Sequence, residues 1–262
     1  MRKYLSVFGL AARSSLWKAL AVTGLTAILA GLMLYFLPRQ ELQPYTDQWG
    51  ETEVIVGSYT FSEAVKNSCA AIALAVGFVI LCAVLAGVGW GKGAKTGYTA
   101  RRLRVQKNTV CLLWTAYYFM VLLLYWAVSA GVMLLALALR VKNATGGELD
   151  SLSMVLACYN APLLHHLLPV GDAFAWCGNI LGLLACAVGC ADVAQKKWRG
   201  QTGGIALAIA VALTVGGCFI SLQNSSNQML LLWVEGAMVG IVAYGWWGGD
   251  KSEETEPDVR RP

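Results

Sequence analysis

Six long apolar stretches separate the polar parts of this sequence and limit the folds that it can adopt. Each is about 19 residues or longer, enough for a helix to cross a hydrocarbon core of about 30 Å. Only 13% of the residues are charged, whereas soluble domains carry about a quarter. We therefore predict an all-α polytopic membrane protein. Its single domain, residues 19–248, has six transmembrane helices at 19–37, 67–90, 109–139, 172–193, 203–222 and 228–248.

The third apolar stretch is longer than a membrane requires. Residues 109–139 stay apolar throughout, although roughly 20 residues suffice for a span. We expect this helix to tilt, to bend near Gly131 or to project beyond the bilayer.

The two ends of the chain differ in character. Residues 1–18 hold four basic and no acidic residues, and their apolar residues fall at helical spacing, so we expect a cytoplasmic interfacial helix. A cleaved signal peptide is the alternative, but the charged region is long and no small-residue cleavage pattern follows the first apolar stretch. Residues 249–262 are polar and contain Pro, and we expect this cytoplasmic tail to be disordered.

Two segments are expected on the outer side of the membrane. In the first, residues 38–66, the alternating sequence at 52–61 predicts a short strand or a stretch lying over the helix ends. The second, residues 140–171, has an apolar part at 151–169 that is interrupted by polar residues and Pro162. Such a stretch favours an interfacial or re-entrant helix over a span.

The segment from Gly91 to Asn108 is the most basic part of the chain. It carries six Lys/Arg and no Asp or Glu. If this segment, both termini and the turn at 195–201 share one side, 16 Lys/Arg lie on that side and 4 on the other. By the positive-inside rule the basic side is cytoplasmic. Because the charges lie beside spans, the net charge of +5 indicates lipid contact and not nucleic-acid binding.

The motifs of common enzyme classes are missing. The sequence contains no HExxH, no GxSxG and no DxD-type cluster. His165 and His166 are adjacent and diverge on a helix, which suits interfacial contacts better than one shared metal. GWGKGAKT at 89–96 comes close to a phosphate-binding loop, but Ala94 replaces its second Gly and a membrane helix precedes it. We predict no enzyme activity, metal or cofactor in this chain.

Glu235 lies inside the last apolar stretch. A carboxylate there costs about 2.5–3.5 kcal/mol on insertion scales, so it is a candidate for a substrate or ion pathway. The alternative is that it faces the bundle and is protonated or satisfied by hydroxyls. Asp172 and Asp192 are expected at helix ends, where Asp172 can cap the fourth span.

Small residues recur at four-residue spacing in two predicted spans. They are Gly178, Gly182, Cys186 and Cys190 in the fourth span, and Gly236 and Gly240 in the sixth. Such stripes let helix backbones approach closely, although chance in a chain with 28 Gly is the alternative. Most of the eight Cys lie in apolar stretches as small hydrophobes, so no disulfide framework is expected.

The basic segment allows two interpretations. It either lies on anionic lipid or forms a docking helix from about Tyr98 to Asn108. In such a helix Tyr98, Arg101, Arg102 and Val105 share one side. Lipid needs only charge, whereas an aromatic and two arginines on one face suit a protein pocket with an acidic rim.

The sequence YTARRLRVQKNTVCLLWTAYYF, residues 98–119, resembles the coupling segment of ABC-2-type transporter permeases of the Gram-positive branch. The basic start, the long outer loop, the six spans and the inner termini are similar too. The resemblance implies a second permease subunit, as a homo- or heterodimer, and a cytoplasmic ATP-binding subunit that holds ATP and Mg²⁺. Its implied contacts are Tyr98, Arg101, Arg102, Leu103 and Val105. QNSSNQ at 223–228 departs from the family, because it is too short for the usual re-entrant hairpin.

The sequence thus predicts the permease subunit of an exporter in a bacterial plasma membrane, with a separate ATPase. Its mostly apolar bundle favours an amphipathic, peptide or drug-like substrate over a small ion. Two other hypotheses stay open. One is a secondary transporter or channel that uses Glu235 for a proton or cation; the other is a non-transporting scaffold or sensor whose basic segment recruits a partner.

Overall fold

Helices make up most of the chain in the computed structural model. It describes residues 2–36, 40–46, 52–58, 65, 68–87, 107–144, 159, 161–169, 171–198, 203–219 and 225–248. The helices are α1 (Arg2–Phe36), α3 (Ala70–Ala86), α5 (Lys107–Ala144), α7 (Pro162–Leu167), α8 (Ala173–Trp198), α9 (Ile205–Phe219) and α10 (Ser225–Gly248). The prediction of a helical chain is confirmed.

Three of these helices are long and apolar enough to cross a membrane: Ala11–Phe36, Asn108–Leu139 and Ala173–Lys197. The other apolar stretches form shorter helical segments at Ala70–Ala86, Ile205–Gly217 and Leu232–Trp246. Residues 1–18 and 19–37, predicted as an interfacial helix and a span, belong to one continuous helix from Arg2 to Phe36. No Pro interrupts this helix, and the residues around the predicted junction are good helix formers.

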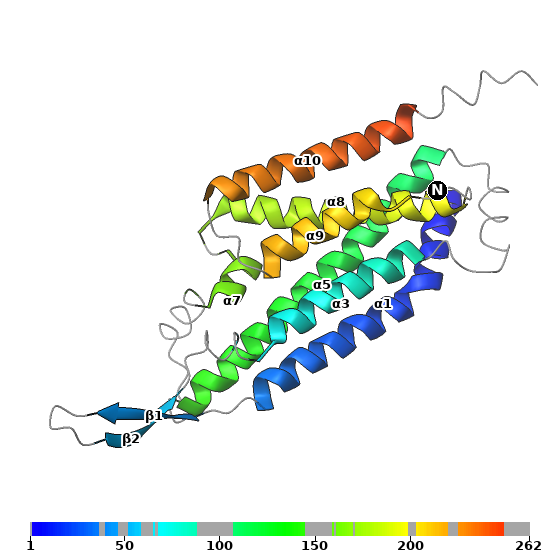
Figure 1. The fold of residues 1–262 in the computed structure, drawn as a ribbon. Helices are drawn as coiled ribbons and strands as arrows, with labels where there is room; N and C mark the ends of the chain where they lie inside the picture. Colours follow the sequence, from blue (N-terminus) through cyan, green and yellow to red (C-terminus); the bar gives the residue numbers. More distant parts are fainter. Residues whose placement is uncertain are drawn as a thin grey trace, which may run out of the picture.

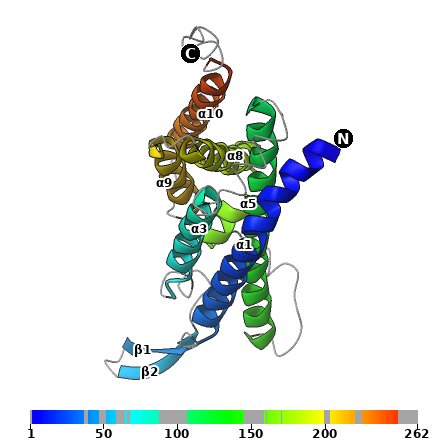
Figure 2. The same ribbon diagram turned by 90° about the vertical axis from the view of Figure 1, so that its right-hand side faces the viewer.

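The helices form an elongated bundle in which chain neighbours run in opposite directions (Figure 1). Helices α1, α3 and α5 pack together, and α8 joins α5 to α9 and α10. The start of α1 and the end of α10 lie toward the same end of the bundle, and the turned view in Figure 2 agrees. This end also holds the end of α3, the start of α5 and the end of α8 (Figure 1).

An aromatic cluster on α5 fills the middle of the bundle. Trp114, Tyr117, Tyr118 and Tyr125 are buried and pack near Phe78 of α3. Opposite them, α8 supplies small buried residues, among which are Cys186, Ala187, Cys190 and Ala191. Small side chains on one helix leave room for rings on the next, so the two helices pack without large voids.

Polar contacts join the helices across this core. The Tyr125 hydroxyl donates to the Leu74 carbonyl of α3 at 2.6 Å, and the Ser15 and Tyr117 hydroxyls of α1 and α5 lie 3.0 Å apart. Such bonds contribute about 0.6 kcal/mol each in a membrane protein. These bonds fix how each helix is rotated about its own axis more than how far it is inserted along that axis.

At the opposite end of the bundle a hairpin extends past the helices (Figure 1). Strands β1 (Gln40–Thr46) and β2 (Thr52–Ser58) are antiparallel, with Gln40 opposite Ser58 and Thr46 opposite Thr52. Of the two possibilities for residues 52–61, the strand is the one observed for residues 52–58. The hairpin adds a small sheet to a fold that we predicted as all helical.

The segment at 151–169, which we expected on the outer side, contains the six-residue helix α7. Its Leu163, Leu164 and Leu167 are buried in a second apolar cluster with residues of α1, α3 and α5, such as Leu34 and Leu137. The described part of this segment is therefore packed into the end of the bundle.

Asp172 caps the start of α8 as predicted. Its Oδ1 accepts hydrogen bonds from the amides of Phe174 at 2.9 Å and Ala175 at 3.2 Å. A carboxylate at this position also complements the helix dipole. The helix continues to Trp198, so most of the turn predicted at 195–201 is its last turn.

Candidate functional site

The predicted partner-binding residues Tyr98, Arg101, Arg102, Leu103 and Val105 lie outside the described residues. The structure does place the ends that flank them. Gly87 follows α3 and Lys107 begins α5, at the bundle end that also holds the start of α1.

Glu235 lies where α8, α9 and α10 meet. Its side chain is only 5% exposed, although it belongs to a helix with many outward apolar residues. Among the described residues, none donates a hydrogen bond to its carboxylate or forms an ion pair with it. A buried carboxylate is costly when none of the described residues donates a hydrogen bond to it, so Glu235 stays a candidate for a functional residue.

Gly182 of α8 makes room for this carboxylate. A Cβ built at Gly182 would lie 2.9 Å from Glu235 Oε1 and 3.1 Å from Thr214 Oγ1 of α9. The Thr214 hydroxyl lies within hydrogen-bond distance of two carbonyls, Ala210 O at 2.8 Å and Gly182 O at 3.3 Å. It is also 3.3 Å from Cys186 Sγ. The carboxylate thus borders a small polar cluster in an apolar bundle.

The predicted small-residue stripes match the packing only in part. Gly182 borders Glu235, and Cys186 and Cys190 are fully buried. Gly178 and Gly240 have open space where a side chain would be, so the predicted close approach is wrong at these two positions. Gly189 was missed: its Cβ would lie 3.1 Å from Leu207 Cα of α9.

A second polar cluster lies near the end of α8. The Lys196 ammonium is 2.7 Å from Asp192 Oδ2, and the Trp246 indole of α10 donates to Asp192 Oδ1 at 3.3 Å. Our placement of Asp192 at a helix end is wrong, because α8 continues six residues beyond it and buries its side chain. The i, i+4 spacing of Asp192 and Lys196 is the signal that could have revealed this ion pair.

His165 and His166 lie on α7 with their ring centroids 6.4 Å apart. Burial and the neighbouring His165 lower the pKa of His166. The His166 carbonyl accepts a hydrogen bond from Asn179 Nδ2 of α8 at 2.7 Å, which ties α7 to α8. Within the described ranges, no three His, Cys, Asp or Glu residues lie close enough together to hold a metal ion.

We compared the chain with known protein families, curated proteins and solved structures. None of them matches it.

Proposed function

We propose that this chain is the permease subunit of an ATP-binding-cassette exporter and that it crosses the membrane six times. The observation that carries the proposal is the place of the two helix ends that flank residues 88–106. The end of α3 and the start of α5 lie at the bundle end where both chain ends of the described fold also lie (Figure 1). Lys107 begins α5, and Lys196 and Lys197 end α8, so this end is basic, as expected for a cytoplasmic side.

Force applied to this segment would reach the core directly. Helices α3 and α5 supply Phe78, Tyr118 and Tyr125 to the central cluster, and Tyr125 bonds to the α3 backbone. A partner ATPase that moves residues 88–106 would therefore displace the helices around which the others pack. In the proposal this partner binds ATP and Mg²⁺, and this chain binds neither.

The rest of the proposal concerns assembly and substrate. A second permease subunit, identical or related, completes the exporter in a bacterial plasma membrane. The shorter helices α3, α9 and α10 lie along the three long ones, which supports their crossing with them. The apolar surface of the bundle favours an amphipathic, peptide or drug-like substrate.

The test is association with the ATPase. The double variant Arg101→Glu and Arg102→Glu reverses two charges on the predicted docking face. It should lower co-purification of an ATP-hydrolysing subunit at least about tenfold, because buried charge pairs at interfaces contribute strongly. The measurement is ATPase recovered per permease after affinity purification.

Lys92→Glu with Lys95→Glu is the matched control. It makes the same charge change in the same segment but off the predicted face, so it should retain the partner. Equal loss in both double variants would show that net charge alone matters, and would contradict the docking face.

Glu235 supports a second candidate, a proton- or cation-coupled secondary transporter. The observation that favours it is the buried carboxylate at the α8–α9–α10 junction, which has no hydrogen-bond donor or ion-pair partner among the described residues. Purified protein that lacks an ATPase partner, yet carries a proton-coupled flux abolished by Glu235→Gln, would establish this candidate in place of the first. Absence of both flux and partner ATPase would leave the scaffold hypothesis.

A further inference from the structure

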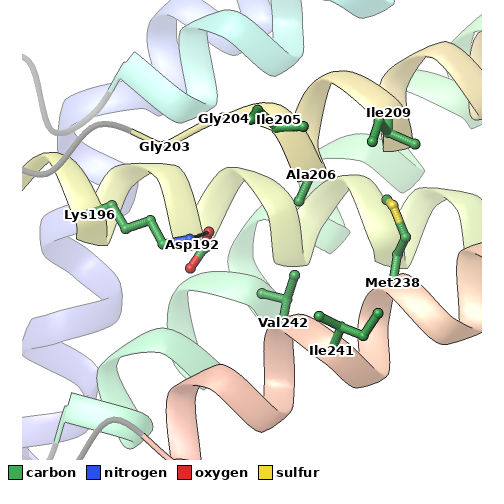
Figure 3. A pocket seen from close by; sticks show the side chains of 10 residues that line it. All are labelled: Asp192, Lys196, Gly203, Gly204, Ile205, Ala206, Ile209, Met238, Ile241 and Val242. Carbon is green, nitrogen blue, oxygen red and sulfur yellow. Dashed lines mark ion pairs between the residues drawn. The ribbon is translucent and has the colours of Figure 1, made fainter.

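A cavity of about 430 Å³ lies between α8, α9 and α10 near the basic end of the bundle. Sites for small molecules commonly measure about 300–1,000 Å³. Figure 3 shows that its lining changes from one end to the other: Asp192 and Lys196 lie at one end, and Ile209 and Met238 at the other. The cavity is therefore amphipathic along its length.

Lys196 is the cationic group at the polar end. Asp192 is 8% exposed in its side chain, and the Trp246 indole also bonds to it, so this carboxylate is fixed and already satisfied. The Lys196 side chain is 45% exposed. An ammonium has three donors, and the Asp192 bond uses one of them. Asp192 thus positions an ammonium that still has donors for another group.

The start of α9 lies at the same end of the cavity. Gly203, Gly204, Ile205 and Ala206 line it. The first amides of a helix have no partner within the helix, and its dipole places about half a positive charge there. Two sources of positive potential, Lys196 and the start of α9, therefore converge on one end of the cavity, and both favour an anion.

Two glycines make this approach possible. A Cβ at Gly203 would lie 2.6 Å from Lys196 Cδ, so any side chain there would push the lysine stem aside. Gly204 has φ +152°, a conformation that residues with side chains rarely adopt. The start of α9 can lie against Lys196 only because neither position carries a side chain.

The other end of the cavity is apolar. Ile209 of α9 and Met238 and Ile241 of α10 line it. Ile209 and Ile241 are exposed. A hydrocarbon chain fits against this wall, because the wall has no polar group that needs a hydrogen-bond partner.

We propose that this cavity binds an amphiphile with a phosphate head group, such as a phospholipid or lysophospholipid. The phosphate lies against the Lys196 ammonium and the first amides of α9. The hydrocarbon chain lies along Ile209, Met238 and Ile241. The site does not depend on the transport activity proposed above, since a resident lipid and a transported one would meet the same groups.

The test uses the whole chain, purified in a neutral maltoside detergent, with dodecyl phosphate as the probe and native mass spectrometry as the readout. Dodecanol and inorganic phosphate are the comparison probes. Dodecyl phosphate should bind at least about tenfold more tightly than either, because only it offers a charged acceptor together with a hydrocarbon chain.

Two variants locate the binding. Lys196→Gln should weaken dodecyl phosphate binding about tenfold, the effect of losing a charge-assisted hydrogen bond, and Lys196→Arg should restore most of it. Ala206→Phe fills the cavity and leaves the ion pair intact, so it should abolish binding even if Lys196→Gln folds poorly. Lys197→Gln removes the same charge one residue further along α8, outside the cavity lining, and should bind as the wild type does.

Three results would overturn the proposal. The first is equal binding of dodecyl phosphate by the wild type and Ala206→Phe. The second is inorganic phosphate binding as tightly as dodecyl phosphate, which would show a free-anion site. The third is dodecanol binding as tightly, which would remove any role for the phosphate.

Discussion

Gly182 and Glu235 act as a pair at the level of single residues. The carboxylate occupies the space that a side chain at position 182 would take. Burial of Glu235 therefore depends on a glycine in another helix, which explains how an acid fits into an apolar three-helix junction.

Gly182→Ala should destabilise the protein. Its Cβ would meet Glu235 Oε1 at 2.9 Å and Thr214 Oγ1 at 3.1 Å. Overpacking costs about 1–3 kcal/mol, while Ala in place of Gly in a helix gains only about 0.5–1 kcal/mol. We expect a lower midpoint of thermal unfolding in detergent.

Gly178→Ala is the matched control. It lies one turn earlier in α8, with no atom within 4 Å of its added Cβ, so only the helix-propensity gain applies. Its midpoint should be equal to or higher than that of the wild type. A comparable fall in both variants would show that the contact with Glu235 is not the cause.

Residue spacing predicted part of this site. It identified Glu235 as a carboxylate inside an apolar helix and Gly182 as a close-packing position. It also selected Gly178 and Gly240, which face open space, and it missed Gly189. Spacing gives the residues that share a helix face, but the rotation of the helix against its neighbours decides which face makes the contact.

At the level of the helices, Gly77 of α3 marks a close approach to two neighbours. At Gly77 an added Cβ would overlap the Thr26 methyl group of α1 and lie 2.7 Å from the Tyr125 hydroxyl of α5. This one position lets three helices meet, and it is next to Phe78, which is buried in the central cluster.

Gly77→Ala should therefore destabilise the bundle more than Gly182→Ala does. The added atom meets the Thr26 methyl group of α1 and the Tyr125 hydroxyl of α5. This hydroxyl donates the hydrogen bond to Leu74 O. We expect a loss toward the upper end of the about 1–3 kcal/mol range for overpacking. Thermal unfolding in detergent measures it.

Gly131→Ala serves as its control on α5, where the added Cβ has no atom within 4 Å. This substitution should leave the unfolding midpoint unchanged or raise it. If Gly77→Ala were equally harmless, the three helices would not be held as closely as described.

The helices themselves were predictable, because each long apolar stretch became one. Their limits were less so. Helix α8 extends to Trp198, and its last turns include the ion pair of Lys196 with Asp192, a contact that exists only once the helix has formed. The cavity could not be predicted, since Lys196 of α8, Ile209 of α9 and Ile241 of α10 come from three helices whose relative positions no local pattern specifies.

For the whole molecule, the number of crossings decides where the chain ends lie. An even number places the N- and C-termini on one side of the membrane, and an odd number places them on opposite sides. Three helices qualify as spans by length and composition alone, and six crossings are proposed.

Reporter fusions distinguish these possibilities. With six crossings, green fluorescent protein fused after Pro262 should fluoresce in the cytoplasm, and alkaline phosphatase inserted after Gly146 should be active outside it. An odd number of crossings would leave the Pro262 fusion outside the cytoplasm and dark, and the six-span proposal would fail. A fusion at Met1 is the reference, because both topologies place it in the cytoplasm.

Helix α5 has 38 residues and continues unbroken through Gly131. At 1.5 Å per residue it is about 57 Å long, almost twice the thickness of a hydrocarbon core of about 30 Å. A rod of this length works as a lever. A small tilt imposed at its Lys107 end, where residues 88–106 attach, becomes a larger sideways movement at its Ala144 end. In the proposed function, α5 therefore transmits movement from one end of the bundle to the other without any change within the helix itself.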